Sequence, residues 1–73
     1  MTSSSHHNLF LAHMQIVEGK ISQLKFREAA QELLRADRVA VHAGDHYEVH
    51  VKRDELITRY GVDWAKAVRE FKL

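Results

Sequence analysis

The sequence contains no cysteine and no proline, and only 3 of its 73 residues are glycine. Without cysteine the chain can form neither a disulfide nor a thiolate metal site, and an intracellular protein needs neither. No proline, internal repeat or flexible linker divides the chain. We therefore expect one domain with a thin core, because a chain this short buries only about 60% of the surface that it exposes when unfolded.

An excess of charge of one sign is also missing. The 11 Lys and Arg residues barely outnumber the 10 Asp and Glu residues, which gives a formal net charge of +1. This balance falls short of the strongly basic character of an autonomous DNA-binding domain. The longest uncharged apolar run, Leu9 to Val17, is about half as long as a membrane span. We expect no membrane segment, no signal peptide and a cytoplasmic location.

Residues 1–8, MTSSSHHN, are polar and of low complexity, so we expect a mobile tail ahead of a single domain over residues 9–73. Two structures fit the next segment. A helix ended by Gly19 would place four apolar side chains on one face: Phe10, Met14, Val17 and Ile21. A strand would place a different set on one side: Phe10, Ala12, Met14 and Ile16. We prefer the helix, and both remain open for residues 9–18.

A second helix is predicted over residues 25–36. Its apolar residues recur at i, i+4, i+7 and i+8, and its other face is charged. Alanine and leucine, which are abundant here, are strong helix formers. The apolar face consists of Phe26, Ala30, Leu33 and Leu34.

The segment RVAVHAGDHYEVHV, from Arg38 to Val51, predicts a β-hairpin with a three-residue loop, Ala43-Gly44-Asp45. A two-residue loop would waste the apolar faces of both strands, because one step of register turns every side chain over. The longer loop pairs Val41 with Tyr47 and Val39 with Val49. We expect burial of Val39, Val41, Tyr47, Val49 and Val51, and exposure of His42, His46, Glu48, His50 and Lys52.

Two short helices should follow the hairpin. Asp54 is expected to cap the first, which Gly61 ends, and Asp63 to cap the second. Their apolar faces comprise Leu56, Ile57 and Tyr60 in the first and Trp64, Val68 and Phe71 in the second. The expected fold class is therefore α+β, a small domain in which helices pack on a two-stranded antiparallel hairpin.

Residues that could carry chemistry are few. The outward His42, His46 and His50, with Glu48 beside them, could hold a divalent metal. We prefer an exposed polar strand face, because such a site also needs supporting partners and a concave pocket, which one open sheet face does not offer. Ser22 has no recognisable base partner and no nucleophile-elbow turn around it. We expect no metal, no cofactor and no enzymatic activity.

The run FREAAQELL, followed by a hairpin and then RDEL, resembles the excisionase and MerR-type winged helix over residues 25–60. The recognition helix of that family, which enters the major groove, has no counterpart after Asp37. This departure favours protein binding over base-specific DNA reading. Contacts with nucleic-acid phosphates are expected, if anywhere, at four basic residues: Arg35, Arg38, Lys52 and Arg53.

In its length, its lack of cysteine and its reduced winged fold, the chain is also similar to small phage-encoded transcription regulators that bind host RNA polymerase, of the type made by a lytic Xanthomonas phage. The resemblance implies binding to the amino-terminal region of the largest catalytic subunit, inhibition of σ-dependent initiation and suppression of termination. The alternatives are an excisionase-like DNA-binding accessory protein and a phage inhibitor of another host complex. We expect a monomer.

The apolar segment near the start of the domain either completes a thin core or forms a partner-binding surface. Both interpretations stay open here, and the predicted site follows the second. One short segment cannot bury all of its apolar side chains on one face, and exposed apolar clusters on small domains usually mark contacts. Lysines on its carboxyl side would steer association. The predicted surface comprises Leu9, Phe10, Leu11, Met14, Val17, Lys20 and Lys25.

Overall fold

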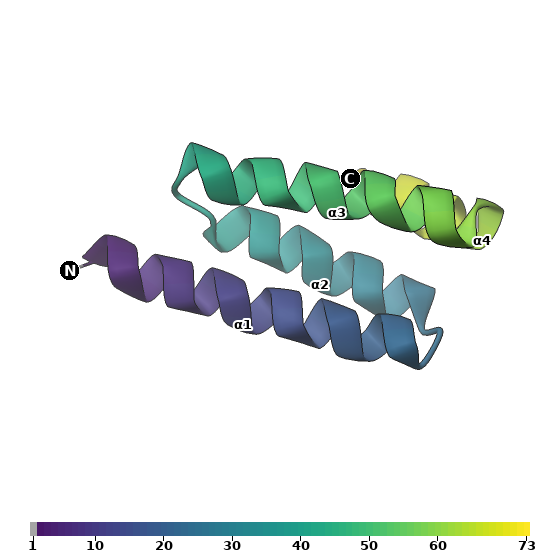
Figure 1. Ribbon diagram of the computed structural model, residues 1–73, viewed down its shortest axis with the longest axis horizontal. Coiled ribbons are helices and arrows are strands. Elements are labelled where there is room, and N and C mark those ends of the chain that lie inside the picture. The colour runs from purple at the N-terminus through teal and green to yellow at the C-terminus, as the bar shows by residue number, and fades with distance from the viewer. Residues whose placement is uncertain (1) are drawn as a thin grey trace.

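The computed structural model describes the backbone of residues 2–73 and the side chains of residues 5–73. This part of the chain contains four α-helices and no β-strand: α1 (Thr2–Ser22), α2 (Phe26–Val39), α3 (Ala43–Tyr60) and α4 (Val62–Glu70). The three long helices run up, down and up, and the short α4 turns back along the bundle (Figure 1). The expected α+β class is therefore wrong.

The predicted β-hairpin is replaced by the end of α2, a short connection and most of α3. Val49 and Leu56 are buried together with Asp45, at a spacing close to the 3.6-residue period of a helix. Tyr47 is 66% exposed, and Val41 and Val51 are exposed as well. The sequence does alternate apolar and polar residues here. Of the three residues expected to be buried on the second strand, Tyr47, Val49 and Val51, only Val49 lies in the core.

Local charges also favour a helix in this segment. Asp45 lies in the first turn of α3 and Arg59 in the last turn, where each complements the helix dipole. Glu55 and Arg59 form an i,i+4 ion pair with a distance of 3.6 Å. Asp54 lies inside α3 and does not cap a helix, so this expectation is wrong.

The first helix confirms the preferred structure for residues 9–18. It also includes residues 2–8, while the mobility expected of that tail stays a prediction and Met1 lies outside the described residues. Gly19 does not end α1, which continues to Ser22. The turn that follows has the hydrogen bonds of a Schellman motif, from the Leu24 N–H to the Ile21 carbonyl and from the Lys25 N–H to the Lys20 carbonyl, both 2.9 Å.

Leu24 occupies the left-handed position of this turn with φ of 58°, where glycine is usual. Its side chain is largely exposed, so little burial would be lost on its removal. We expect Leu24→Gly to stabilise the protein by about 0.5–1 kcal/mol, a rise of several degrees in Tm measured by circular dichroism. Gln23→Gly is the matched control. It should lower Tm, because Gln23 does not share the positive φ of Leu24; a lower Tm for Leu24→Gly would contradict the assignment of strain.

The core lies around α2, against which α1, α3 and α4 all pack. Three buried alanines of α2 let the neighbouring helices approach closely: Ala29, Ala30 and Ala36. The larger buried side chains come from all four helices: Phe10, Val17, Ile21, Leu33, Val49, Leu56 and Trp64. The helix predicted over residues 25–36 is thus confirmed, although it continues to Val39, and the structure places it at the centre of the fold.

The last two helices meet at Gly61, as the sequence predicts. With φ of 65°, Gly61 ends α3, and its N–H bonds to the Ile57 carbonyl at 2.8 Å. Helix α4 begins at Val62 with Gly61 at its N-cap, so Asp63 lies inside the first turn and the expectation that it caps the helix is wrong. Trp64 is fully buried, and its Nε1–H donates to the Arg53 carbonyl at 2.9 Å, which joins α4 to α3.

Candidate functional site

The exposed surface of α1 is the most unusual feature of this molecule. All 21 Lys, Arg, Asp and Glu residues of the chain lie at or after position 18, so α1 carries none of them before Glu18. Three large apolar side chains on this helix are nevertheless exposed, Leu9 at 46%, Leu11 at 44% and Ile16 at 43%. We define the α1 outer face by its exposed uncharged residues: Ser5, Asn8, Leu9, Leu11, Ala12, Gln15 and Ile16.

Depletion of charged residues distinguishes the centre of a protein interface from the rest of a protein surface better than hydrophobicity does. In this chain 29% of all residues are charged, so their absence from an exposed helix face is a strong local departure. Ala12 lies between Leu9 and Ile16 at helical spacing, and its small side chain would let another element approach closely. The α1 outer face therefore has the composition of a docking surface.

The structure divides the partner-binding residues predicted from the sequence. Phe10 and Val17 are buried in the core and cannot contact a partner, and Met14 is partly buried. Lys20 Nζ forms an ion pair with Glu28 Oε1 at 2.9 Å, and Lys25 is exposed just before α2. Of the predicted set, only two apolar residues lie on the α1 outer face: Leu9 and Leu11. The predicted set omitted Ala12 and Ile16, which the period of 3.6 residues could have found once the helix was accepted.

A groove of about 390 Å³ lies between α1 and α3 along one edge of the α1 outer face. Its volume is within the roughly 300–1,000 Å³ range of ligand pockets. Two interhelical contacts cross it, His7 Nδ1 to Asp45 Oδ2 at 3.0 Å and Lys52 Nζ to Glu18 Oε1 at 2.5 Å. The groove is lined by His7, Phe10, Leu11, Met14, Gln15, Glu18, Asp45, Glu48 and Lys52.

The four basic residues expected near phosphates do not act as one cluster. Arg35 is paired with Glu32 on its own helix, whereas Lys52 is paired with Glu18 across the groove. Arg53 contacts Asp54 and the Leu73 carbonyl, which leaves Arg38 as the exposed member without a partner among the described residues. This arrangement provides no continuous basic track for a nucleic-acid backbone.

Three histidine–carboxylate contacts, which sequence reasoning missed, join the three long helices. His13 on α1 bonds to Glu32 on α2 at 2.9 Å, and His46 on α3 bonds to Asp37 on α2 at 2.8 Å. The third is His7–Asp45 between α1 and α3. The partners of each pair lie on different helices, 38, 19 and 9 positions apart, so they could not be identified before the helices were placed. Each contact connects a different pair of long helices, so together they help to set the register of the bundle.

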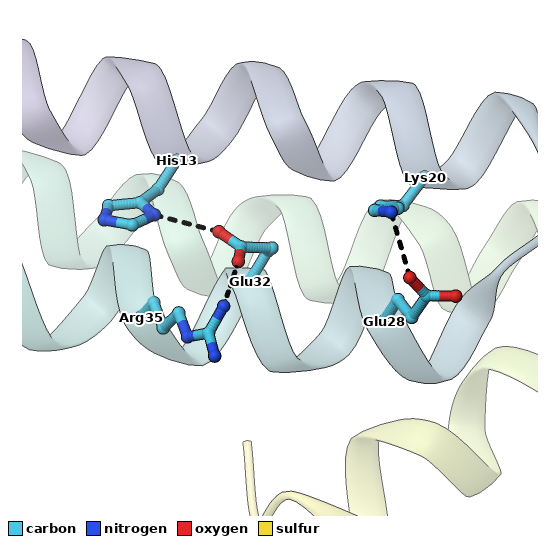
Figure 2. Close-up of polar contacts among 5 residues, drawn as sticks. All are labelled: His13, Lys20, Glu28, Glu32 and Arg35. Atoms are coloured by element: carbon cyan, nitrogen blue, oxygen red, sulfur yellow. Dashed lines mark hydrogen bonds and ion pairs between the residues drawn. The ribbon is translucent and has the colours of Figure 1, made fainter.

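Figure 2 shows the seam between α1 and α2, where Glu32 receives hydrogen bonds from both His13 and Arg35. Burial by itself raises the pKa of the Glu32 carboxyl, but the hydrogen bonds and charges of His13 and Arg35 lower it by more. The net pKa is below the ordinary glutamate value. Glu32 is therefore ionised in the folded protein at neutral pH and stabilises the fold above its unfolded-state pKa.

We expect Glu32→Gln to destabilise the protein at pH 7 by about 1–2 kcal/mol, because both charge-assisted hydrogen bonds are weakened. A lowered carboxyl pKa contributes stability that is lost as pH falls through the folded pKa, so the difference between wild type and variant should shrink below about pH 4.5. Urea unfolding at several pH values measures this. Glu28→Gln, at the more exposed Lys20–Glu28 pair (Figure 2), is the control and should change stability less. An equal effect of both substitutions would contradict the special role of Glu32.

The three histidines that the sequence predicts on one strand face, His42, His46 and His50, do not form a cluster in the structure. His42 precedes α3, His46 is engaged by Asp37, and His50 is exposed. Within residues 5–73 no group of three His, Asp or Glu side chains is placed to hold a metal ion. The hairpin that would have opposed His42 to His46 does not exist, so the geometric basis of the metal alternative is removed.

A larger cavity, of about 500 Å³, lies where the start of α2 meets α4, and Lys25 is part of its lining. Three basic and three acidic side chains surround it, with Phe26 and Ala67 among the apolar ones. Since Arg27 pairs with Glu70 at 2.7 Å, part of this charge is internally compensated. The balanced lining selects no ligand of particular charge, so the groove beside α1 is the better-defined site.

Comparison of the chain with protein-family models, curated proteins and solved structures gave no match. Among the helices that the structure describes, none combines the length and the hydrophobicity needed to cross a bilayer. The function must therefore be argued from the surface of this molecule itself.

Proposed function

We propose that this chain is a non-catalytic binding module that docks on a larger protein through the α1 outer face. The observation that carries this proposal is the coincidence of three exposed large apolar side chains, Leu9, Leu11 and Ile16, with a helix face free of Lys, Arg, Asp and Glu. Burial of such a face removes apolar surface from water without the cost of desolvating a charge.

The partner that we propose is bacterial RNA polymerase in the cytoplasm, bound at the amino-terminal region of its largest catalytic subunit. Binding there by the monomer would inhibit σ-dependent initiation and suppress termination. The length and the cysteine-free composition, which the chain shares with small phage-encoded regulators, support this proposal. The winged hairpin no longer does, because residues 38–51 are not strands. The excisionase alternative loses its wing for the same reason, and no feature of the basic residues favours it.

The docking surface is tested with the double variant Leu9→Glu/Ile16→Glu, which places two charges on the α1 outer face. We expect binding to immobilised polymerase to weaken by about tenfold or more, because charge is poorly tolerated in an interface centre. Biolayer interferometry measures Kd, and single-round transcription measures initiation and termination. Ile57→Glu is the control, since Ile57 is also exposed but lies on α3.

The possible results separate the two parts of the proposal. Unchanged binding by the folded double variant would show that the α1 outer face is not the contact. A folded wild-type chain that does not bind polymerase would overturn the choice of partner. In that case, the same variant and control can be applied to another host complex captured from a bacterial lysate.

A further inference from the structure

The groove between α1 and α3 combines an apolar floor with an acidic rim, and we propose that it receives a basic amphipathic helical segment of the protein partner. This inference rests on the proposed function, because it specifies what a partner docked on α1 would insert beside that helix.

The floor of the groove is apolar and suited to side chains of different shapes. Met14, a partly buried and flexible side chain, forms part of this floor, and the buried ring of Phe10 lies beneath it. Leu11 stands at the edge, where 44% of it is exposed. Methionine and aromatic side chains are common in grooves that bind the apolar face of a partner helix.

The charge of the lining favours a cationic occupant. Three carboxylates face the groove, against one ammonium group, that of Lys52, and one imidazole, that of His7. Glu18 is paired with Lys52, and Asp45 is paired with His7, so two of the three carboxylates already have partners. Glu48 lies between Asp45 and Lys52 along α3, is exposed, and has no ion-pair or hydrogen-bond partner among the described side chains. A lysine or arginine of the occupant would find its counter-charge at Glu48.

The shape of the groove suits a helix. Its lining extends from His7 to Glu18 on α1 and from Asp45 to Lys52 on α3, which corresponds to about 16 Å and about 10 Å of helix. The two helices run in the same direction in Figure 1, so the groove follows their length. An amphipathic segment of two to three turns could lie along it, with its apolar side chains on Leu11 and Met14 and a basic side chain beside Glu48.

The test uses a synthetic peptide of about four helical turns, with leucines at i, i+3, i+4 and i+7 and lysines elsewhere. It is added to the full ¹⁵N-labelled chain, and amide shifts are followed by NMR. We expect saturable binding, with shift changes concentrated in residues 7–18 and 45–52. The matched peptide, in which glutamate replaces every lysine, should bind at least about tenfold more weakly.

Two variants with the same charge reversal decide whether the groove is responsible. Glu48→Lys should weaken binding of the lysine peptide by about tenfold, whereas Glu55→Lys, on the same helix but outside the groove lining, should weaken it far less. Circular dichroism checks that both are folded. The proposal is overturned if the lysine peptide does not bind, if the two peptides bind equally, if both variants lose binding equally, or if the shifts lie elsewhere. These results would leave the proposed function standing, because polymerase binding and its dependence on Leu9 and Ile16 are measured separately.

Discussion

Val49→Asp should unfold this protein, whereas Tyr47→Asp, two residues earlier, should leave it folded. Val49 is 2% exposed and packs in the core, so an aspartate there would be an unpaired buried charge. The expected loss exceeds about 4 kcal/mol, which is comparable with the whole stability of a domain this small. Tyr47 is largely exposed on α3, and its replacement should cost no more than about 1 kcal/mol.

This pair of substitutions tests the helix directly. In the β-hairpin expected from the sequence, residues 47 and 49 share one buried face, so both variants would be equally damaging. In α3 they point in different directions, and only one is buried. Thermal and urea unfolding followed at 222 nm provide the comparison. Loss of the folded state in Tyr47→Asp would count against the assignment of this segment to a helix.

Trp64→Ala should be the second most damaging change, with a loss of about 3–5 kcal/mol. Trp64 is fully buried, and its ring lies near that of Phe26, with a centroid separation of 6.5 Å. Its removal leaves a cavity between α4 and the bundle and also removes the hydrogen bond to the Arg53 carbonyl. Because this is the only tryptophan, unfolding must be followed by circular dichroism and not by its fluorescence.

Trp64→Phe separates the two contributions. It retains most of the apolar ring but removes the N–H donor, so we expect a smaller loss of roughly 1–3 kcal/mol. Val62→Ala is the control on the same helix, because Val62 is 71% exposed and its truncation should change stability by less than about 0.5 kcal/mol. A stable Trp64→Ala protein would show that α4 does not depend on this side chain for docking.

The candidate site was only partly predictable. The number of apolar residues between Leu9 and Val17 indicated that some would remain exposed, and Leu9, Leu11 and Ile16 are exposed in the structure. Which ones are exposed depended on the choice of helix over strand. The groove could not be anticipated, since it is formed by α1 and by a part of α3 that had been assigned to a hairpin. His7 and Asp45, which are 38 positions apart, meet there.

The sequence by itself determined the features that depend on local chemistry. The spacing of Phe26, Ala30 and Leu33 predicted the central helix, and the left-handed conformation available to glycine predicted the break at Gly61. These signals act within a few residues and do not depend on what packs nearby. The absence of charge before Glu18 is likewise a property of the sequence alone.

Only the tertiary structure decided the state of residues 43–60. Tyr47, Val49 and Val51 fit a strand by their period of two, while Asp45, Val49 and Leu56 fit a helix by their longer spacing. Intrinsic helix and strand propensities amount to about 1 kcal/mol or less per residue, so packing readily overrides them. Packing against α2 and α4 selected the helix, with added contacts from His46 to Asp37 and from Trp64 to the Arg53 carbonyl. The physical reason is that burial energy depends on surfaces supplied by distant parts of the chain, which no local pattern contains.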